Sequence, residues 1–150
     1  MTTNTGPHSL EIERGLIGAT IYFVECQVHL RKLDPSEFAD QTCGQAWAAM
    51  QELHEAGHPI ERVAVFQKIG VSVDDTDDPF MVAVDKMRTY QRPDSLTLIN
   101  AVRNLAGLRW MLKLAGMIQY EAWLPGAVAE QVGRLVAEEV NDVLAAMMPE

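Results

Sequence analysis

The sequence predicts an all-α protein in which a small globular helical bundle is followed by a long antiparallel helical hairpin. Aromatic residues make up only 7% of the chain, while Ala, Val, Leu and Met are plentiful, and this composition suits helices better than a β-sandwich. Apolar residues recur at intervals of three and four in most segments, as they do along one face of a helix. The last third of the chain holds two long helical patterns separated only by Pro125-Gly126, which predicts the hairpin.

The chain begins with residues 1–8, which are small and polar and are expected to be disordered. Ser9 then provides an N-cap for a helix from Leu10 to about Val28, whose apolar residues follow helical spacing. Residues 19–24 also have the β-branched and aromatic character of a strand, so a strand is the alternative for this stretch.

Proline and glycine divide the rest of the globular part, residues 9–91, into short helices. Asp-Pro pairs mark helix starts, because Asp caps free backbone N–H groups and proline fits the first turn. Glycine marks helix ends, because it adopts the left-handed conformation that closes a helix. The predicted elements are a short turn from Asp34 to Phe38, helices from Thr42 to Ala56, from Glu61 to Ile69 and from Pro79 to about Tyr90, and an acidic loop from Val71 to Asp77.

Residues 95–148 are predicted to form the hairpin, after a break in the helical pattern at residues 91–94. Its helices, Ser95 to Leu124 and Ala127 to about Met148, each carry an apolar stripe. Pairing the two helices hides only part of these stripes, and so long a hairpin overhangs so small a body. We therefore expect a second copy to cover the rest in a two-fold four-helix contact; the alternative is a monomer whose hairpin folds back on the body. The expected oligomer interface consists of Leu105, Leu108, Trp110, Met111, Leu112, Val136, Val140 and Val143.

The charge of the chain argues against a nucleic-acid-binding module. Twelve basic and 21 acidic residues give a formal net charge of −9, and the longest basic cluster is Arg31-Lys32. Because nucleic-acid affinity depends mainly on Lys and Arg neutralising phosphates, we expect no tight direct binding to nucleic acid. No apolar stretch reaches the length of a membrane span, and Cys26 and Cys43 are isolated thiols that fit a reducing compartment. These features predict a cytoplasmic protein without membrane contact.

One segment, His54-Glu55-Ala56-Gly57-His58, matches the H-E-x-x-H pattern of zinc proteases. That chemistry needs both imidazoles on one face of a continuous helix, with the Glu as general base. Gly57 lies inside the motif and Pro59 follows it, so the helix should end within the motif and His58 should leave the face of His54. We therefore expect no metal site and no catalytic residue, with a small zinc hydrolase as the alternative function.

The other chemical patterns are incomplete. The phosphate-binding loop and the G-x-G-x-x-G motif are both absent, so we expect neither a nucleotide cofactor nor ATPase activity. Neither cysteine has a histidine at a spacing that supports a nucleophilic pair. The acidic loop lacks the central Gly and late Glu of an EF-hand, although four of its residues could offer oxygen ligands: Asp74, Asp75, Asp77 and Asp78.

Several aromatic and small residues have structural interpretations. Gly15 and Gly18 allow close helix packing, and Trp47 and Met50 are expected in the core. Three aromatic residues of the first hairpin helix could either pad the hairpin against the body or form a subunit contact: Trp110, Tyr120 and Trp123.

Two ordered motifs are LEIERGLIGA at residues 10–19 and FADQTCGQAWAAMQELHEAGHPIE at residues 38–61. The first resembles the E-A-E-x-x-V-L-G opening of the N-terminal domain of DnaB-type replicative helicases. The second resembles that domain's F-Y-x-x-x-H-x-x-I-F-x-A-M-x-x-L-x-x-x-G-x-P-I-D stretch, and residues 96–145 are similar to the helical hairpin that follows it. Cys43 stands where the family has His, and Glu61 stands where it has Asp.

The resemblance implies a non-catalytic assembly and partner-binding domain. In such helicases the hairpins pair between subunits, dimers form a three-fold collar above the ATPase ring, and the collar docks primase and, in some systems, loading factors. It therefore implies a homo-oligomer, a dimer or a trimer of dimers, with a primase or a helicase loader as partner. The sequence stops where a helicase would continue into its ATPase domain, so the chain is either part of a helicase or a stand-alone homologue, such as a viral one. A stand-alone regulator of helicase assembly is the third interpretation.

Overall fold

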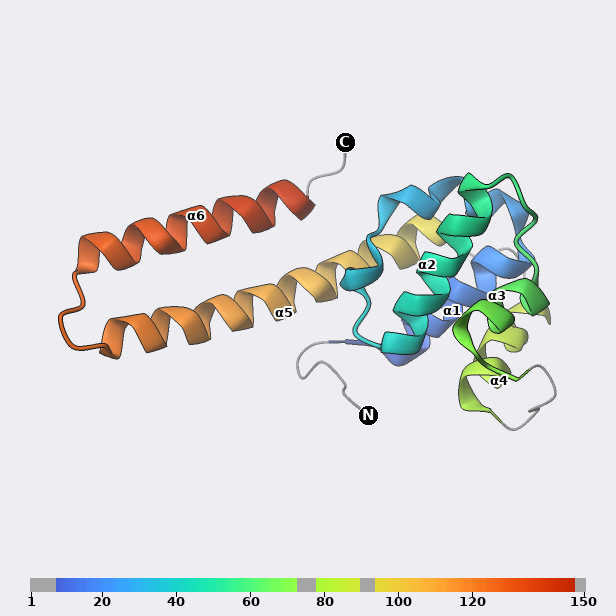
Figure 1. Ribbon diagram of the computed structural model, residues 1–150, viewed down its shortest axis with the longest axis horizontal. Coiled ribbons are helices and arrows are strands. Elements are labelled where there is room, and N and C mark those ends of the chain that lie inside the picture. The colour runs from blue at the N-terminus through green and yellow to red at the C-terminus, as the bar shows by residue number, and fades with distance from the viewer. Residues whose placement is uncertain (1–7, 73–77, 90–93, 148–150) are drawn as a thin grey trace.

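Helices make up the regular structure of residues 8–72, 78–89 and 94–147, the part of the chain that the computed structural model describes. The shorter helices form a rounded body, and the last two extend from it as a long hairpin (Figure 1). The hairpin turns at its far end and brings the last helix back toward the body (Figure 1). The predicted all-α class, with a helical bundle followed by an antiparallel hairpin, is confirmed.

The first helix is shorter than its sequence suggests. α1 spans Leu10–Tyr22, and the side chain of Ser9 caps it as predicted. The chain is extended at Phe23 and continues as a 3-10 helix, η1, over Val24–Lys32. The prediction of one α-helix to Val28 is therefore wrong beyond α1, and the strand alternative is wrong as well.

Packing explains the break after α1. In η1, Cys26 and Leu30 are 3% and 1% exposed, whereas Val24 and Val28 are 68% and 72% exposed. Burying Cys26 and Leu30 requires the chain to turn along the body, whereas a straight continuation of α1 would carry both away from the core. Long-range contacts thus override an apolar pattern that is locally compatible with a longer helix.

Two of the other body elements begin at the predicted Asp-Pro caps, Asp34 and Asp78, and a third begins at Asp40, which was not predicted as a cap. Asp34, Asp40 and Asp78 each accept a hydrogen bond from a backbone N–H in the following turn. Gly70, with a φ of 78°, ends a helix in the left-handed conformation. The body elements after η1 are η2 (Pro35–Glu37), α2 (Gln41–Glu55), α3 (Arg62–Ile69), α4 (Pro79–Lys86) and η3 (Met87–Thr89).

The last body helix differs from its prediction. It is α-helical only to Lys86 and then tightens into η3. Its predicted end at Tyr90 and most of the predicted acidic loop, residues 73–77, lie outside the described residues.

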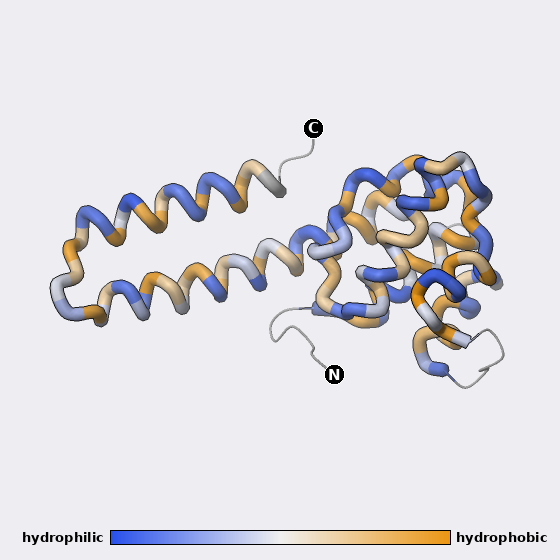
Figure 2. The backbone as a smooth tube through the Cα atoms, in the orientation of Figure 1, coloured by the Kyte–Doolittle hydropathy of each residue, from blue (hydrophilic) through white to orange (hydrophobic). Residues whose placement is uncertain are grey.

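The hairpin consists of α5, Ser95–Trp123, and α6, Ala129–Met147. α6 turns its hydrophobic residues toward α5 and its hydrophilic residues outward (Figure 2). Leu114 and Val143, each 8% exposed, form the buried seam between the two helices. None of the described helices is long and apolar enough to cross a bilayer.

The core lies among α1, α2, α3, α4 and the first turns of α5. Trp47 and Met50 are fully buried, as predicted, and the Trp47 indole donates a hydrogen bond to the Leu33 carbonyl at 3.0 Å. Ile99 and Val102 of α5 are each 1% exposed and belong to the same core. The sequence predicts that the first turns of α5 belong to the hairpin, but in the structure they pack as part of the body.

α1 and α4 approach closely at one glycine. A Cβ at Gly18 would lie 2.6 Å from the carbonyl oxygen of Val84 and 2.6 Å from Met87 Cγ. A Cβ at Gly15 would meet only Met87 Sδ, at 3.9 Å. Close packing therefore requires glycine at position 18 and not at position 15.

We expect Gly18→Ala to destabilise the fold by about 1–3 kcal/mol, because the Val84 carbonyl can give way only if the two helices separate. Gly15→Ala is the matched control and should stabilise the fold by about 0.5–1 kcal/mol, because Ala favours a helix interior. Urea unfolding followed by far-UV circular dichroism measures both changes. Equal stabilities of the two variants would contradict the close contact.

Candidate functional site

The H-E-x-x-H motif lies at the point where α2 stops. α2 ends at Glu55, Gly57 has a φ of 74°, and the backbone N–H of His58 donates to the Leu53 carbonyl at 2.9 Å. His54 and His58 are exposed and share no continuous helix, as the glycine predicted. In the described ranges, no three His, Cys, Asp or Glu side chains are grouped to hold a metal ion. The structure thus gives the zinc-hydrolase alternative no metal site.

The cysteines and the described part of the acidic segment offer no reactive group either. Cys26 and Cys43 are buried free thiols. Burial, together with the charge and hydrogen bond of Asp40, raises the pKa of Cys43 far above its ordinary value, so this thiol stays protonated. Of the four aspartates at residues 74–78, only Asp78 lies among the described residues, and it caps α4.

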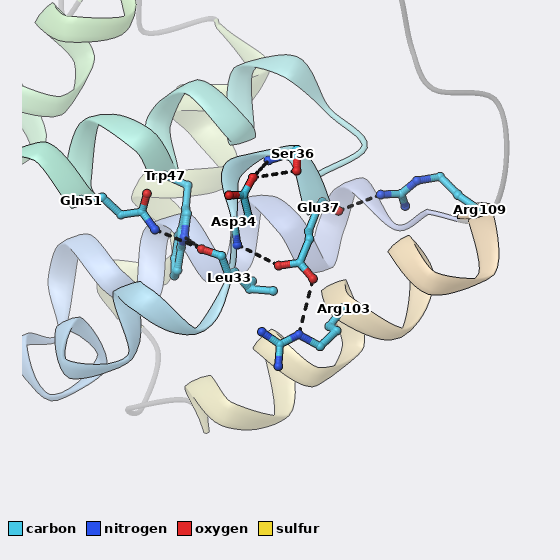
Figure 3. A network of polar contacts seen from close by, with 8 residues as sticks. All are labelled: Leu33, Asp34, Ser36, Glu37, Trp47, Gln51, Arg103 and Arg109. Atoms are coloured by element: carbon cyan, nitrogen blue, oxygen red, sulfur yellow. Dashed lines mark hydrogen bonds and ion pairs between the residues drawn. The ribbon is translucent and has the colours of Figure 1, made fainter. Parts of the chain in front are cut away.

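A polar network joins the hairpin to the body (Figure 3). Arg103 and Arg109 of α5 both reach Glu37 in η2. Arg103 Nε lies 3.4 Å from Glu37 Oε1, and Arg109 Nη2 donates to the Glu37 carbonyl at 2.7 Å. The Glu37 carboxylate also accepts a hydrogen bond from the Asp34 backbone N–H at 2.7 Å. Glu37 therefore connects the cap of η2 to two positions on α5.

Side chains of α2 hold the chain segment just before this contact. Gln51 Nε2 donates to the carbonyls of Leu30 and Leu33 at 2.8 and 3.0 Å, and Trp47 reaches the same Leu33 carbonyl (Figure 3). The segment that α5 contacts is therefore fixed from its other side as well.

Glu13 places a buried carboxylate at this joint. It is 1% exposed, and its two oxygens accept hydrogen bonds from the backbone N–H groups of Ala39 and Asp40 at 3.2 and 3.0 Å. Burial raises the pKa of Glu13, and the two N–H groups and the nearby Arg109 guanidinium oppose that rise. Glu13 thus ties α1, the start of α2 and α5 together.

Sequence reasoning missed the four charged residues that join the hairpin to the body: Glu13, Glu37, Arg103 and Arg109. Glu13 reads as an acidic residue near the positive end of a helix, a common surface feature. Arg109 reads as a polar interruption of an apolar stripe. The signal that could have found them is helical spacing, which places both on the buried side of their helices.

Beyond this joint, the hairpin carries most of the exposed apolar surface. Eleven of the sixteen exposed large hydrophobic residues in the described part of the chain lie between Leu108 and Leu144. Trp110, Tyr120 and Trp123 are 48%, 66% and 83% exposed, so they do not pad the hairpin against the body. The hairpin extends away from the body instead of folding back on it (Figure 1). Single apolar residues on a surface are ordinary, but a concentration of this kind indicates an interaction site.

One side of the hairpin is an apolar surface built by both helices. Met111, Val140 and Leu144 line a small cavity with the seam residues Leu114 and Val143, so the first three lie on one side of the seam. Helical spacing adds further uncharged residues to that side and its edge, and we call the set the Met111 face. Its members are Leu108, Met111, Leu112 and Ala115 of α5 and Gly133, Ala137, Val140 and Leu144 of α6.

The other side of the hairpin carries a different set of residues. Trp110 precedes Met111 by one residue and is rotated from it by about 100°, which places it across the seam. We call the residues on this side the Trp110 face. Its members are Trp110, Lys113, Met117, Tyr120, Glu121 and Leu124 of α5 and Leu135, Glu139 and Asp142 of α6.

These two faces divide the predicted oligomer interface. Four of its eight residues are members of the Met111 face, and Leu105 and Val136 are half-buried. Trp110 lies on the opposite side of the hairpin. Val143 is buried in the seam of its own hairpin, so it is not exposed to a second copy.

Comparison with known proteins identifies a matching family and a similar solved structure. A family model described as the DnaB-like helicase N-terminal domain matches residues 5–79, half of the chain. The fold is similar to the crystal structure of the N-terminal domain of DnaB helicase from Mycobacterium tuberculosis, with a TM-score of 0.74 at 16% sequence identity. That match covers 92% of this chain and 99% of the other, so it includes the hairpin. No curated protein matches the chain.

We expect Glu13→Ala to destabilise the protein by about 3 kcal/mol, because it leaves two buried N–H groups without their acceptor and removes a buried negative charge near Arg109. Glu11→Ala is the matched control in the same helical turn, and its exposed carboxylate should contribute no more than about 0.5 kcal/mol. Denaturant unfolding at neutral pH checks both values. A Glu13→Ala variant as stable as the control would show that the joint does not depend on this carboxylate.

Proposed function

The chain belongs to the family of DnaB-like helicase N-terminal domains, and on this basis we propose that it is a non-catalytic assembly and partner-binding domain of a DnaB-like replicative helicase. In this proposal the hairpin mediates homo-oligomerisation, as a dimer that can build a trimer of dimers. A primase or a helicase loader docks on the assembled domains during DNA replication in the cytoplasm. ATP-driven unwinding would belong to the motor domain of the helicase and not to this domain.

The exposed apolar surface of the hairpin is the observation that carries the proposal. Leu108, Met111 and Leu112 are 40%, 48% and 58% exposed, and Leu144 is 45% exposed, although all four lie on one continuous face. Covering that face with a second hairpin would remove it from water and build a four-helix contact.

The distribution of residue sizes on the Met111 face supports self-association. The body-proximal end carries Leu108, Met111 and Leu144, whereas the end near the turn carries Gly133 and Ala137. In two antiparallel copies, the large residues of each would meet the small residues of the other. Large residues packed against small ones fill space well, as in the interdigitated layers of helical cores. A two-fold axis would place both contacts in the same interface.

We expect Leu112→Asp to convert the oligomer into folded monomers. Leu112 is more than half exposed, so an aspartate there is solvated in the monomer. In the assembled state the charge would be buried in an apolar contact without a partner, which costs several kcal/mol. Multi-angle light scattering at tens of micromolar measures the mass, and circular dichroism checks that the helices persist.

The control for this experiment adds the same charge outside the proposed interface. Gln131→Glu lies nine residues before Val140, about half a turn round α6 from it, and should leave the oligomer intact. A monomeric mass for the unmodified protein, or dissociation by both variants, would refute assembly through the Met111 face.

The partner role is tested by co-purification with a full-length helicase and its primase. A domain of the collar should retain primase when assembled, whereas a stand-alone regulator should bind the helicase itself and change its subunit number.

A further inference from the structure

The Trp110 face is a second apolar stripe, separate from the proposed oligomer interface. Trp110, Met117, Tyr120 and Leu124 follow one another at spacings of seven, three and four residues, so they lie along one line of α5. Their exposed fractions are 48%, 39%, 66% and 37%. α5 is thus apolar on two exposed sides over its distal half, and a helix that is apolar all round is one that neighbours cover.

A hollow adjoins this stripe near the turn of the hairpin. It is lined by Gly116, Gln119, Tyr120, Trp123 and Leu124. Gly116 contributes to the hollow because no atom lies within 4 Å of the position that its Cβ would occupy. The stripe and the hollow together form a shallow, open apolar surface on which the side chains of another helix could pack.

The charges around the stripe are mainly acidic. Glu121 of α5 and Glu139 and Asp142 of α6 belong to the Trp110 face, whereas Lys113 is its single basic member. A second copy that bound through the same face would bring its own Glu121, Glu139 and Asp142 to the contact. Like charges that face each other across a contact are unfavourable, so this side of the hairpin disfavours self-association.

We propose that the Trp110 face is a docking site for a basic amphipathic helix of a different protein. The apolar residues of that helix would pack on Trp110, Met117 and Tyr120, and its Lys or Arg residues would pair with the acidic residues on the α6 side. This inference rests on the proposed function in that it takes partner docking as a role of the domain. It adds the surface and the chemical class of the partner.

The test uses a synthetic helical peptide of about three heptads, with Leu at the heptad core positions and Lys on the flanks, labelled for fluorescence anisotropy. An otherwise identical peptide with Glu in place of Lys is its control. We expect the basic peptide to bind the intact protein with a Kd on the order of 10 μM and the acidic peptide to bind at least tenfold more weakly.

Two protein variants assign the binding to one face of the hairpin. Tyr120→Ser changes a side chain that is 66% exposed, so the fold should persist, and peptide binding should weaken at least fivefold. Leu112→Asp changes the Met111 face and should leave peptide binding unchanged. Circular dichroism verifies that both variants are folded.

The outcomes separate this inference from the proposed assembly role. Absence of basic-peptide binding, equal binding of the two peptides, or binding that is weakened by Leu112→Asp and not by Tyr120→Ser would each overturn the docking site. Light scattering on the same samples reports the oligomer independently. A monomeric unmodified protein that still binds the basic peptide would overturn assembly and leave the docking site in place.

Discussion

The buried carboxylate of Glu13 is the constraint on which the arrangement of the molecule depends. A charge that is 1% exposed needs compensating donors, and here they come from the backbone ahead of α2 and from Arg109 on α5. The three elements can satisfy it only in one relative position. The joint therefore sets the direction in which the hairpin leaves the body, and with it the placement of every residue on the two hairpin faces.

The contacts around Glu13 fix the position of a hairpin that has two different exposed faces. The body is covered by its own helices, but α5 and α6 can hide only the sides that they turn to each other, around Leu114 and Val143. Two exposed faces are left, one mainly apolar and rich in small residues, the other aromatic with an acidic border. In the proposed assembly, different chemistry on the two sides would direct a like partner to one face and an unlike partner to the other.

Local signals predicted the fold well, whereas residues that act through long-range contacts escaped prediction. Asp caps, prolines and glycines placed most helix ends within two residues, because these residue types act on the backbone next to them. The end of α1 was wrong because burial of Cys26 and Leu30 decides it. The candidate site was predicted in part: Leu108, Met111, Leu112 and Val140 share a face, but only the pairing of α5 with α6 shows that the adjacent Trp110 belongs to the opposite one.

Because α5 is continuous from the core to the turn, the directions of the two hairpin faces depend on the number of residues in this helix. Ile99 is anchored in the body and Trp123 lies at the far end of the same uninterrupted helix. Inserting or deleting one residue between the joint and the seam would rotate everything beyond it by about 100°. Both faces would then point in new directions while the body stayed unchanged. A change in the length of α5 therefore keeps both faces in the same directions only if it is close to a whole number of helical turns, such as about seven or about eleven residues.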